Sequence, residues 1–468
     1  MPTPIEETVQ SMWSGETLDE LCEFVRLPAK SVGFDPEWEK NGYLLEACRR
    51  AAQWGKKLFP QAVFEVLSEP GKSPALYFDI AGTNEAVSSS VFFYGHFDKQ
   101  PEGQGWSCGR KAFEPSLEGD KLYGRGAADD GYNFYAAMTA LTAIDRSQTP
   151  RPRAVGLFET AEECDSVDFE YWLTKCAGRI GRVSLAVVLD STCCDYERLW
   201  STVSFRGAVL FTLNVKVLEH GVHSGTASGI VPDSFTIARA LLERIEKAQT
   251  GEIAAPALNA EIPQERIAQM RQCAQILGDR VAQEFPWAGG THARSADVFE
   301  LLVMRGWKPQ MAVTGAEGLP ALKDAGNVLR SGTRIKCSIR IPPTVDPQAT
   351  LDWVRSELTR DPIFGCEVTL DPVSAGRGWN APAQKPWFAQ AFDAASRELC
   401  GAPAAYCCDG ASIPILTLMQ DVLGDAQFLV TGVLGPESNA HGPDEMLRLD
   451  YARKLTCAVA RVIAAIKE

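Results

Sequence analysis

Short apolar runs recur along the first 190 residues, and most of them lead into an acidic residue or a histidine. Runs of this length, rich in Val, Phe, Ile and Leu, predict buried strands. They lie at residues 62–67, 76–80, 89–97, 153–158 and 183–189. Amphipathic helical spacing precedes the first run, through Leu44, Leu45 and Cys48, and a capping box at residues 17–20 predicts the start of an earlier helix. Strands that alternate with helices favour an α/β fold whose mixed, largely parallel sheet has helices on both faces.

The pattern changes near Ser204. Apolar and polar residues alternate at 209–217 and 333–341, and helical patterns lie between these stretches at 234–248, 266–284 and 296–306. Alternation predicts strands with one open face, and hence an α+β domain. Near residue 376 the helix–strand pattern returns. We therefore expect a domain formed by residues 1–203 and 376–468, with a second domain, 204–375, inserted into it.

Composition narrows the classes of function. The chain of 468 residues is 45% hydrophobic and 23% charged, and its net charge of −14 argues against nucleic acid or an anionic membrane as a partner. We find neither an apolar span of membrane-crossing length nor a signal-peptide pattern at the start. The 14 cysteines are scattered without a Cys-x-x-Cys motif. They predict reduced thiols and a cytoplasmic location rather than a disulfide framework or a zinc finger.

Histidines and acids gather where the predicted strands end. His96 and Asp98 are two residues apart and would leave the strand on one face. Similar positions are held by Asp129-Asp130, Glu162-Glu163, Asp190 and, far downstream, the Asn439–Glu445 segment with His441. Any one of these acids is more simply a solvated strand end or a helix N-cap. All of them together predict an open site for zinc or a similar divalent ion, and the excess of carboxylates favours two ions.

The motifs His-x-Asp, Gly-Arg-Gly-Ala-x-Asp-Asp, Glu-Glu, a strand-end Asp and a late Asn-x-His together resemble one family. It is the dizinc metallopeptidase family of carnosinase-type dipeptidases, acetylornithine deacetylase, succinyl-diaminopimelate desuccinylase and carboxypeptidase G. The resemblance extends from about residue 70 to the C-terminus, in matching order. It implies two Zn²⁺ per chain, with Mn²⁺ or Co²⁺ as alternatives. The implied metal ligands are His96, Asp129, Glu163, Asp190 and His441, with Asp129 bridging the two ions.

The resemblance also implies the catalytic residues. Glu162 would be the general base and acid acting on a water that bridges the metals, and Asp98 would support His96. The inserted domain would be a dimerisation and lid domain of a homodimer. Within it, His223-Ser224-Gly225 resembles the segment whose histidine reaches the active site of the partner subunit.

Four residues resemble the family's substrate-binding positions. Arg340 in Ser-Ile-Arg would hold the substrate carboxylate, Gly410 and Ser412 lie in a Gly-Ser-Ile-Pro-like loop, and Asn327 stands where carnosinases have a threonine. An aspartate at position 190 goes more often with dipeptidases, so the resemblance favours hydrolysis of dipeptides or similar small substrates with a free carboxylate. The alternative is an N-acyl-amino-acid deacylase of the same family.

Some features depart from the family or compete with it. Gly131 replaces the usual lysine, Cys164-Asp165 follows Glu163, and Arg377 lies near the place of a substrate-contacting histidine; these departures bear on substrate identity. Ser107 in Gly-x-Ser-x-Gly offers a serine hydrolase as a distant alternative. That motif requires a strand before it and a helix after it. Neither is predicted here. A non-catalytic scaffold would not need Glu162 beside Glu163.

Overall fold

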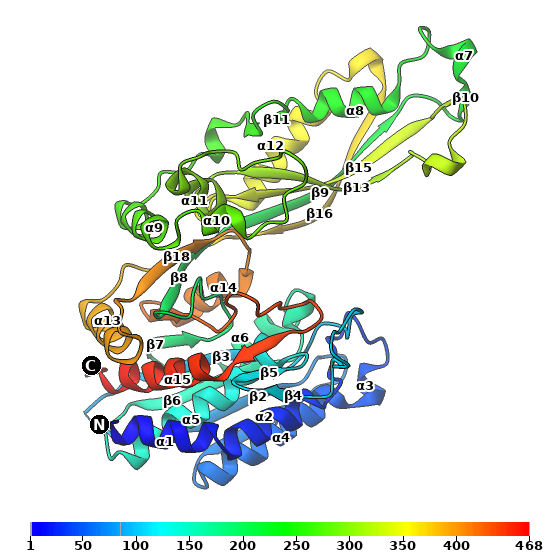
Figure 1. Ribbon diagram of the computed structural model, residues 1–468. Helices are drawn as coiled ribbons and strands as arrows, with labels where there is room; N and C mark the ends of the chain where they lie inside the picture. The colour runs from blue at the N-terminus through cyan, green and yellow to red at the C-terminus, as the bar shows by residue number, and fades with distance from the viewer. Residues whose placement is uncertain (1, 85, 468) are drawn as a thin grey trace. The chain divides into compact units, whose positions relative to one another are not determined.

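The computed structural model describes residues 2–84 and 86–467 (Figure 1). Met1, Glu85 and Glu468 lie outside the described residues. Met1 and Glu468 are the first and last residues of the expected first domain. The chain forms two compact units, one made of Met1–Thr202, Ala381–Cys407 and Leu418–Glu468, the other of Val203–Asn380 and Cys408–Thr417. Each unit has its own sheet.

The first unit contains a six-stranded sheet in the described chain, with strand order β1-β2-β6-β3-β7-β19. Its strands are β1 (Val63–Leu67), β2 (Ala75–Ile80), β6 (Arg153–Glu159), β3 (Ser90–His96), β7 (Val183–Val188) and β19 (Gln427–Val430). β3 is parallel to β6 and β7, and β19 is parallel to β7, whereas β2 is antiparallel to its neighbours. The predicted α/β fold with a largely parallel sheet is therefore confirmed. Every residue of β3 is buried, because both faces of the sheet are covered.

Helices of the first unit pack around this sheet (Figure 1). They are α1 (Pro4–Trp13), α2 (Glu16–Val25), α3 (Trp38–Asn41), α4 (Tyr43–Leu58), η1 (Ala127–Gly131), α5 (Tyr132–Arg146), η2 (Glu162–Cys164), α6 (Phe169–Ile180), α13 (Pro386–Cys400) and α15 (Leu449–Ala464). α5 packs on β3 and against α1 and α15, and α4 packs on β1 and β2. Phe134 of α5 contacts Phe78, Phe97 and Phe158 edge to face, so aromatic rings join helix and sheet. Three short strands, β4 (Ser116–Glu118), β5 (Lys121–Tyr123) and β20 (Met446–Arg448), form a separate sheet.

The predicted capping box at residues 17–20 is wrong. α2 begins one residue before Thr17, whose hydroxyl is buried and lies 2.8 Å from the Thr139 hydroxyl of α5. The capping box is instead at Thr3, which accepts from the Glu6 N–H while the Glu6 carboxylate accepts from the Thr3 N–H. The Thr17 side chain, which local spacing assigned to a helix cap, thus makes a tertiary hydrogen bond to α5 instead.

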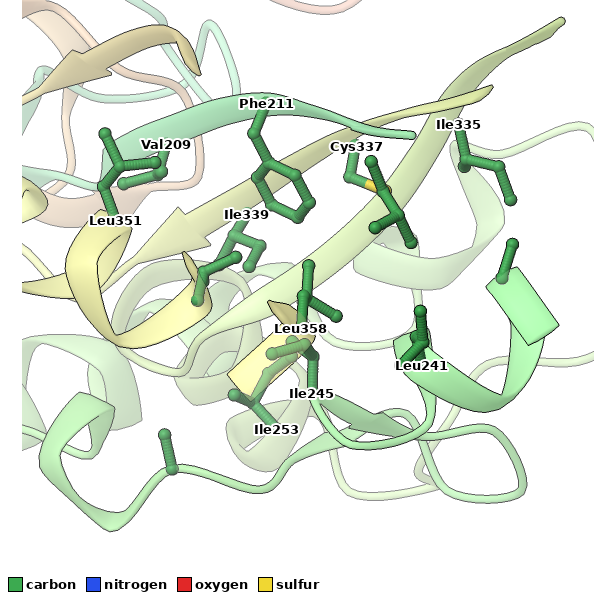
Figure 2. Packing of buried hydrophobic residues seen from close by; sticks show 14 of the residues in the cluster. Val209, Phe211, Leu241, Ile245, Ile253, Ile335, Cys337, Ile339, Leu351 and Leu358 are labelled. Atoms are coloured by element: carbon green, nitrogen blue, oxygen red, sulfur yellow. The ribbon is translucent and has the colours of Figure 1, made fainter. Parts of the chain in front are cut away.

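The second unit is built on a four-stranded antiparallel sheet, in the order β13-β15-β9-β16. The strands are β13 (Gln310–Glu317), β15 (Gly332–Ile341), β9 (Gly207–Lys216) and β16 (Glu367–Gly376). Ile335, Cys337 and Ile339 of β15 are buried as predicted, and they face Leu241, Ile245 and Leu358 in the core (Figure 2). α8 and α12 cover that face. The predicted α+β unit is therefore present.

The remaining elements of the second unit include two helical regions that are shorter or more divided than predicted. They are β10 (Val222–His223), α7 (Ser224–Ala227), α8 (Ser234–Leu242), β11 (Glu246–Lys247), β12 (Glu252–Ile253), η3 (Pro256–Leu258), α9 (Gln264–Leu277), α10 (Arg280–Gln283), α11 (Val298–Trp307), η4 (Leu322–Asp324), β14 (Val328–Leu329), α12 (Pro347–Thr359) and η5 (Ile363–Gly365). The helix expected at 234–248 ends at Leu242, because the chain then pairs β11 with β12. The helix expected at 266–284 is divided at Gly278, whose φ of 54° is left-handed.

The chain passes between the units at four places. β8 (Trp200–Phe205), β17 (Trp379–Asn380), β18 (Ala405–Asp409) and α14 (Pro414–Leu423) lie there. Cys408–Thr417 belongs to the second unit, although we expected it in the first. The reason is Arg206, whose backbone N–H donates to the Ala411 carbonyl (3.0 Å) and whose Nε donates to the Gly410 carbonyl (3.0 Å).

All 14 cysteines are free thiols. Among the helices of the described chain, none combines the length and the apolar character needed to cross a membrane.

Candidate metal centre

Three parallel strands end side by side and direct their following loops to one edge of the sheet. β3 ends at His96, β6 ends at Glu159 just before Glu162-Glu163, and β7 ends at Val188 just before Asp190. Asp129 lies in η1, which is held against β3 because Asp130 Oδ2 accepts from the His96 N–H (3.2 Å). Ligand sites in open α/β sheets lie at this carboxyl edge.

Two groups of potential metal donors form here, and they share one residue. His96 Nε2 lies 3.3 Å from Asp129 Oδ1 and 3.6 Å from Asp190 Oδ2. His441 Nε2 lies 3.0 Å from Asp129 Oδ2 and 3.1 Å from Glu163 Oε2. Each oxygen of Asp129 therefore belongs to a different group. The sequence-predicted ligands all lie within these two groups.

The donor set fits divalent metal ions. His96 Nε2 is buried without a hydrogen-bond partner among the described residues, and carboxylate oxygens surround it. An imidazole nitrogen left without a donor or acceptor in such a setting suits metal ligation. Imidazole and carboxylate ligands without thiolates are typical of catalytic zinc and related ions.

Asp98 supports both halves of the centre. Its Oδ1 lies 3.4 Å from His96 Nδ1, and its two oxygens accept from the backbone N–H groups of Glu162 (3.1 Å) and Glu163 (3.0 Å). Gln100 then orients the Glu163 side chain, because its backbone N–H and its Nε2 donate to the two carboxylate oxygens at 3.2 and 2.8 Å. A carboxylate behind a ligating imidazole fixes the orientation of the ring.

The electrostatics of the centre reflect crowded carboxylates. Burial, followed by the Asp129 charge, raises the pKa of Asp190 to about 7. Hydrogen bonds to Asp129 and Glu163 raise the pKa of His441 to about 10. Burial would raise the pKa of Asp129, but the hydrogen bond from His441 and the charges of His96 and His441 outweigh it and lower that pKa. The raised pKa of His441 and the lowered pKa of Asp129 therefore have the same cause, the attraction between the two side chains.

Glu162 lies outside both donor groups. Its Oε2 is 3.8 Å from His96 Nε2, and its side chain keeps 23% of its exposure. Burial raises the pKa of this carboxyl group well above its ordinary value, and the charges of Asp190 and Glu163 act in the same direction. A half-buried carboxyl group with a raised pKa is suited to accept and release a proton.

In the second unit, the predicted substrate-binding residues fall into two places. Arg340 Nη1 donates to Ser412 Oγ (2.6 Å), and Arg206 Nε donates to the Gly410 carbonyl. Burial, then the nearby Arg340 charge, lowers the pKa of Arg206 to about 10, while Asp409 opposes that shift. This cluster, which we call the arginine cluster, consists of Arg206, Arg340 and the loop Asp409–Ser412.

His223 and Asn327 lie elsewhere in the second unit. His223 on β10 pairs with Val328 on β14, next to Asn327, and both side chains are exposed. β10 lies beyond the end of β15 that begins at Gly332 (Figure 1), whereas Arg340 is near the other end of that strand. Eight residues of strand, about 26 Å, separate those ends. Within this unit, His223 therefore does not meet Arg340.

Two of the features that depart from or compete with the family motifs, Ser107 and Cys164, have structural explanations. Ser107 lies in a long loop between β3 and β4, and its backbone N–H donates to Asp444 Oδ1 (3.0 Å), so the strand and helix that flank a nucleophile elbow are absent from this part of the described chain. Cys164 Sγ accepts from the Ser31 hydroxyl (3.1 Å) and packs on Gly33. Arg377 lies between β16 and β17.

Three polar residues at the centre were missed from the sequence: Gln100, Arg125 and Glu445. Gln100 adjoins the His-x-Asp motif and could have been found from that adjacency. Arg125 and Glu445 are 320 positions apart and pair only in the folded chain.

A largely parallel sheet with two histidine–carboxylate groups at its carboxyl edge defines a candidate metallohydrolase. The chain belongs to peptidase family M20/M25/M40, whose family model matches residues 92–465. It is accordingly a metallopeptidase-family hydrolase, and its family implies metal ions.

Named relatives are distant. The chain is similar to the beta-Ala-His dipeptidase of Homo sapiens, with 26% identity over 74% of this chain and 69% of that protein. It is 22% identical to the cysteinylglycine-S-conjugate dipeptidase of Corynebacterium striatum, over 84% of this chain and 85% of that one. Its fold is similar to that of the di-peptidase Dug1p from Saccharomyces cerevisiae (TM-score 0.75, 18% identity, 99% and 98% covered) and of human carnosine dipeptidase 1 (TM-score 0.73, 22% identity, 99% and 100% covered).

Proposed function

We propose that the protein is a dizinc dipeptidase that hydrolyses the peptide bond of small substrates with a free carboxylate. The observation that carries the proposal is the pair of donor groups joined through Asp129, with Glu162 beside them but outside both. In this proposal His96, Asp129 and Asp190 hold one ion, and Asp129, Glu163 and His441 hold the other. The distant dipeptidase relatives support the substrate class.

Glu162 is the proposed general base and acid. Bound divalent ions supply Lewis acidity toward the scissile carbonyl and lower the pKa of water. Glu162 takes a proton from the attacking water and delivers it to the leaving amine, a role supported by its raised pKa and partial exposure. Asp98 keeps His96 and the Glu162-Glu163 backbone in place throughout.

Arg340 is the proposed ligand of the substrate carboxylate, and Ser412 and Gly410 form the loop beside it. A guanidinium fork can hold a carboxylate through two parallel hydrogen bonds.

His223 and Asn327 are proposed to act in the active site of a partner subunit in a homodimer. Their separation from Arg340 by about 26 Å of strand within one unit supports that assignment.

A cytoplasmic location is part of the same proposal, supported by the 14 free thiols. The sequence alternative, an N-acyl-amino-acid deacylase, differs only in the acyl half of the substrate and is an outcome of the test below.

The test combines metal analysis with a substrate panel. Purified protein should contain about two divalent ions per chain, and chelation should abolish hydrolysis, with activity restored by Zn²⁺, Mn²⁺ or Co²⁺ added separately. On a matched panel, dipeptides should be cleaved faster than N-acyl amino acids with the same C-terminal residue. Full activity in metal-free protein contradicts the metal mechanism, and faster cleavage of the N-acyl compounds makes the protein a deacylase.

A further inference from the structure

The loop that carries His441 has an unusual backbone. Four of its non-glycine residues adopt left-handed conformations, with φ between 51° and 68°: Glu437, Asn439, His441 and Asp444. Such conformations are uncommon for residues with a Cβ and persist only when the surroundings hold them. The His441 side chain is also 56% exposed, so packing contributes little to its position. Other contacts must therefore hold this imidazole near Asp129.

Arg125 supplies the first set of contacts. Its side chain is only 1% exposed, and Nη2 donates to the carbonyl oxygens of His441 and Gly442, both at 3.0 Å. Nε donates to the Pro101 carbonyl (3.1 Å), one residue after Gln100. The guanidinium group thus binds the backbone of His441 itself and the segment that orients Glu163.

Glu445 supplies the second set. It is fully buried, and its Oε2 accepts from Arg125 Nη1 at 2.7 Å. Its Oε1 accepts from three backbone N–H groups, those of Gly126 (3.0 Å), Ala128 (3.1 Å) and Asp129 (3.2 Å). Because both oxygens only accept, the contacts suit the ionised carboxylate. Glu445 therefore ties the His441 loop to the segment that carries Asp129.

We propose that Arg125 and Glu445 are positioning residues that set the affinity of the Asp129–Glu163–His441 group for its metal ion. The inference rests on the proposed function. The other group shares Asp129, but it depends less on this pair, because His96 on β3 is supported by Asp98 and Asp190 follows β7 directly. Outer contacts that orient metal ligands typically account for 10- to 100-fold in metal affinity.

The experiment titrates metal-free protein with Zn²⁺ in a calorimeter, without substrate. Wild type should bind two ions. Glu445→Gln keeps the size of the side chain but not its charge. It should lower the affinity of the Asp129–Glu163–His441 group for its ion by about 10- to 100-fold and leave the affinity for the other ion nearly unchanged. Arg125→Lys, which keeps a charge but cannot reach Glu445 and the carbonyls together, should weaken the same ion less.

Arg151→Lys is the matched control. Arg151 is also 1% exposed, and it donates two hydrogen bonds to the Asp145 carboxylate (2.7 and 2.8 Å) and others to the Ala81 and Pro152 carbonyls. It precedes β6, however, and so lies at the edge of the sheet opposite the metal centre. It should leave both Zn²⁺ affinities unchanged. Equal weakening of both ions in Glu445→Gln and in the control would mean that loss of a buried ion pair acts only through general stability, and would overturn the proposal.

A double-mutant cycle isolates the route through His441. His441→Asn alone should weaken the same ion, and adding Glu445→Gln to it should then cause little further loss. Fully additive losses, or unchanged Zn²⁺ affinities in both Glu445→Gln and Arg125→Lys, would overturn the positioning role while wild type still binds two ions. A wild type that binds fewer than two ions would overturn the proposed function as well.

Discussion

The metal centre of the first unit and the arginine cluster of the second unit have opposite charge and a similar construction. The first gathers five carboxylates, Asp98, Asp129, Glu162, Glu163 and Asp190, around two imidazoles. The second brings Arg206 and Arg340 together with Asp409 as the opposing charge. Burial raises the pKa of Asp190 and Glu162, and it lowers the pKa of Arg206 and Arg340. Burial therefore disfavours the charged form of these four side chains.

Backbone groups hold the charges in both places. Asp98 accepts from two backbone N–H groups, and Arg206 donates to the Gly410 carbonyl. Neutral backbone partners fix a charged side chain without neutralising it, so the charge remains available to a ligand. The difference in sign matches the ligands proposed above, which are cations in the first region and a carboxylate in the second.

The largest effect is expected from replacing Glu162, the proposed general base and acid, in the metal centre. Glu162→Gln should keep both metal ions and lose on the order of 10²–10⁴ in kcat, because a positioned acid–base group contributes that much. Steady-state kinetics with metal analysis of the same preparation is the measurement. Loss of an ion with the activity would mean that Glu162 is a ligand.

Removing a charge from the arginine cluster should give a smaller and more selective effect. Arg340→Ala should lower kcat/KM by roughly 30- to several-thousand-fold, since a desolvated ion pair costs about 2–5 kcal/mol to break. C-terminally amidated dipeptides should be poor substrates for wild type and little worse for the variant.

Arg334→Ala is the control for that substitution. Arg334 is on the same face of β15, is 52% exposed and pairs with Glu317 at 2.6 Å. It should change kcat/KM very little, because exposed ion pairs are weak. Equal losses on free and amidated substrates in Arg340→Ala would mean that Arg340 is structural.

Mixed dimers test whether His223 of one subunit completes the metal centre of the other. A His223→Ala chain and a Glu162→Gln chain should each be nearly inactive alone. A heterodimer would contain one doubly defective site and one intact site, so activity should recover toward half that of wild type per heterodimer. Confirmed subunit exchange without recovery would place His223 outside the partner's site.

The smallest effect, on stability rather than activity, is expected from Asp168, whose carboxylate is already paired with Lys72 within the first unit. Burial would raise the pKa of Asp168, but hydrogen bonds from Lys72 Nζ (2.8 Å) and from Ser73 outweigh it and lower that pKa. The ionised Asp168 carboxylate therefore contributes its full stabilisation of the fold at pH values above the unfolded-state pKa of about 3.9. That stabilisation is lost as pH falls through the lower pKa of the native state. Asp168→Asn should lower the free energy of unfolding by about 1–2 kcal/mol at pH 7.

Denaturant unfolding at several pH values measures that difference, which should close in acid. Glu114→Gln is the control, since Glu114 and its partner Lys111 are both about two-thirds exposed. It should leave stability nearly unchanged at every pH. A difference for Asp168→Asn that stays constant from pH 7 into acid would contradict the role of its charge.

Much of the fold could be predicted because the signals are local. Apolar runs gave the strands that end at His96, Glu159 and Val188, and a parallel sheet brings such ends together. Features that depend on distant residues were missed. Thr17 binds Thr139 instead of capping a helix, and no local period relates Arg125 to Glu445.

The inserted unit also separates the parts of the metal centre in time. During synthesis, Asp190 leaves the ribosome 251 residues before His441, an interval of roughly 10–50 s at ordinary elongation rates. β19, which pairs with β7, is made in the same late stretch. Until then β7 has an open edge that can pair with other chains. The order of the chain therefore leaves the nascent first unit with an unpaired strand edge until β19 is added.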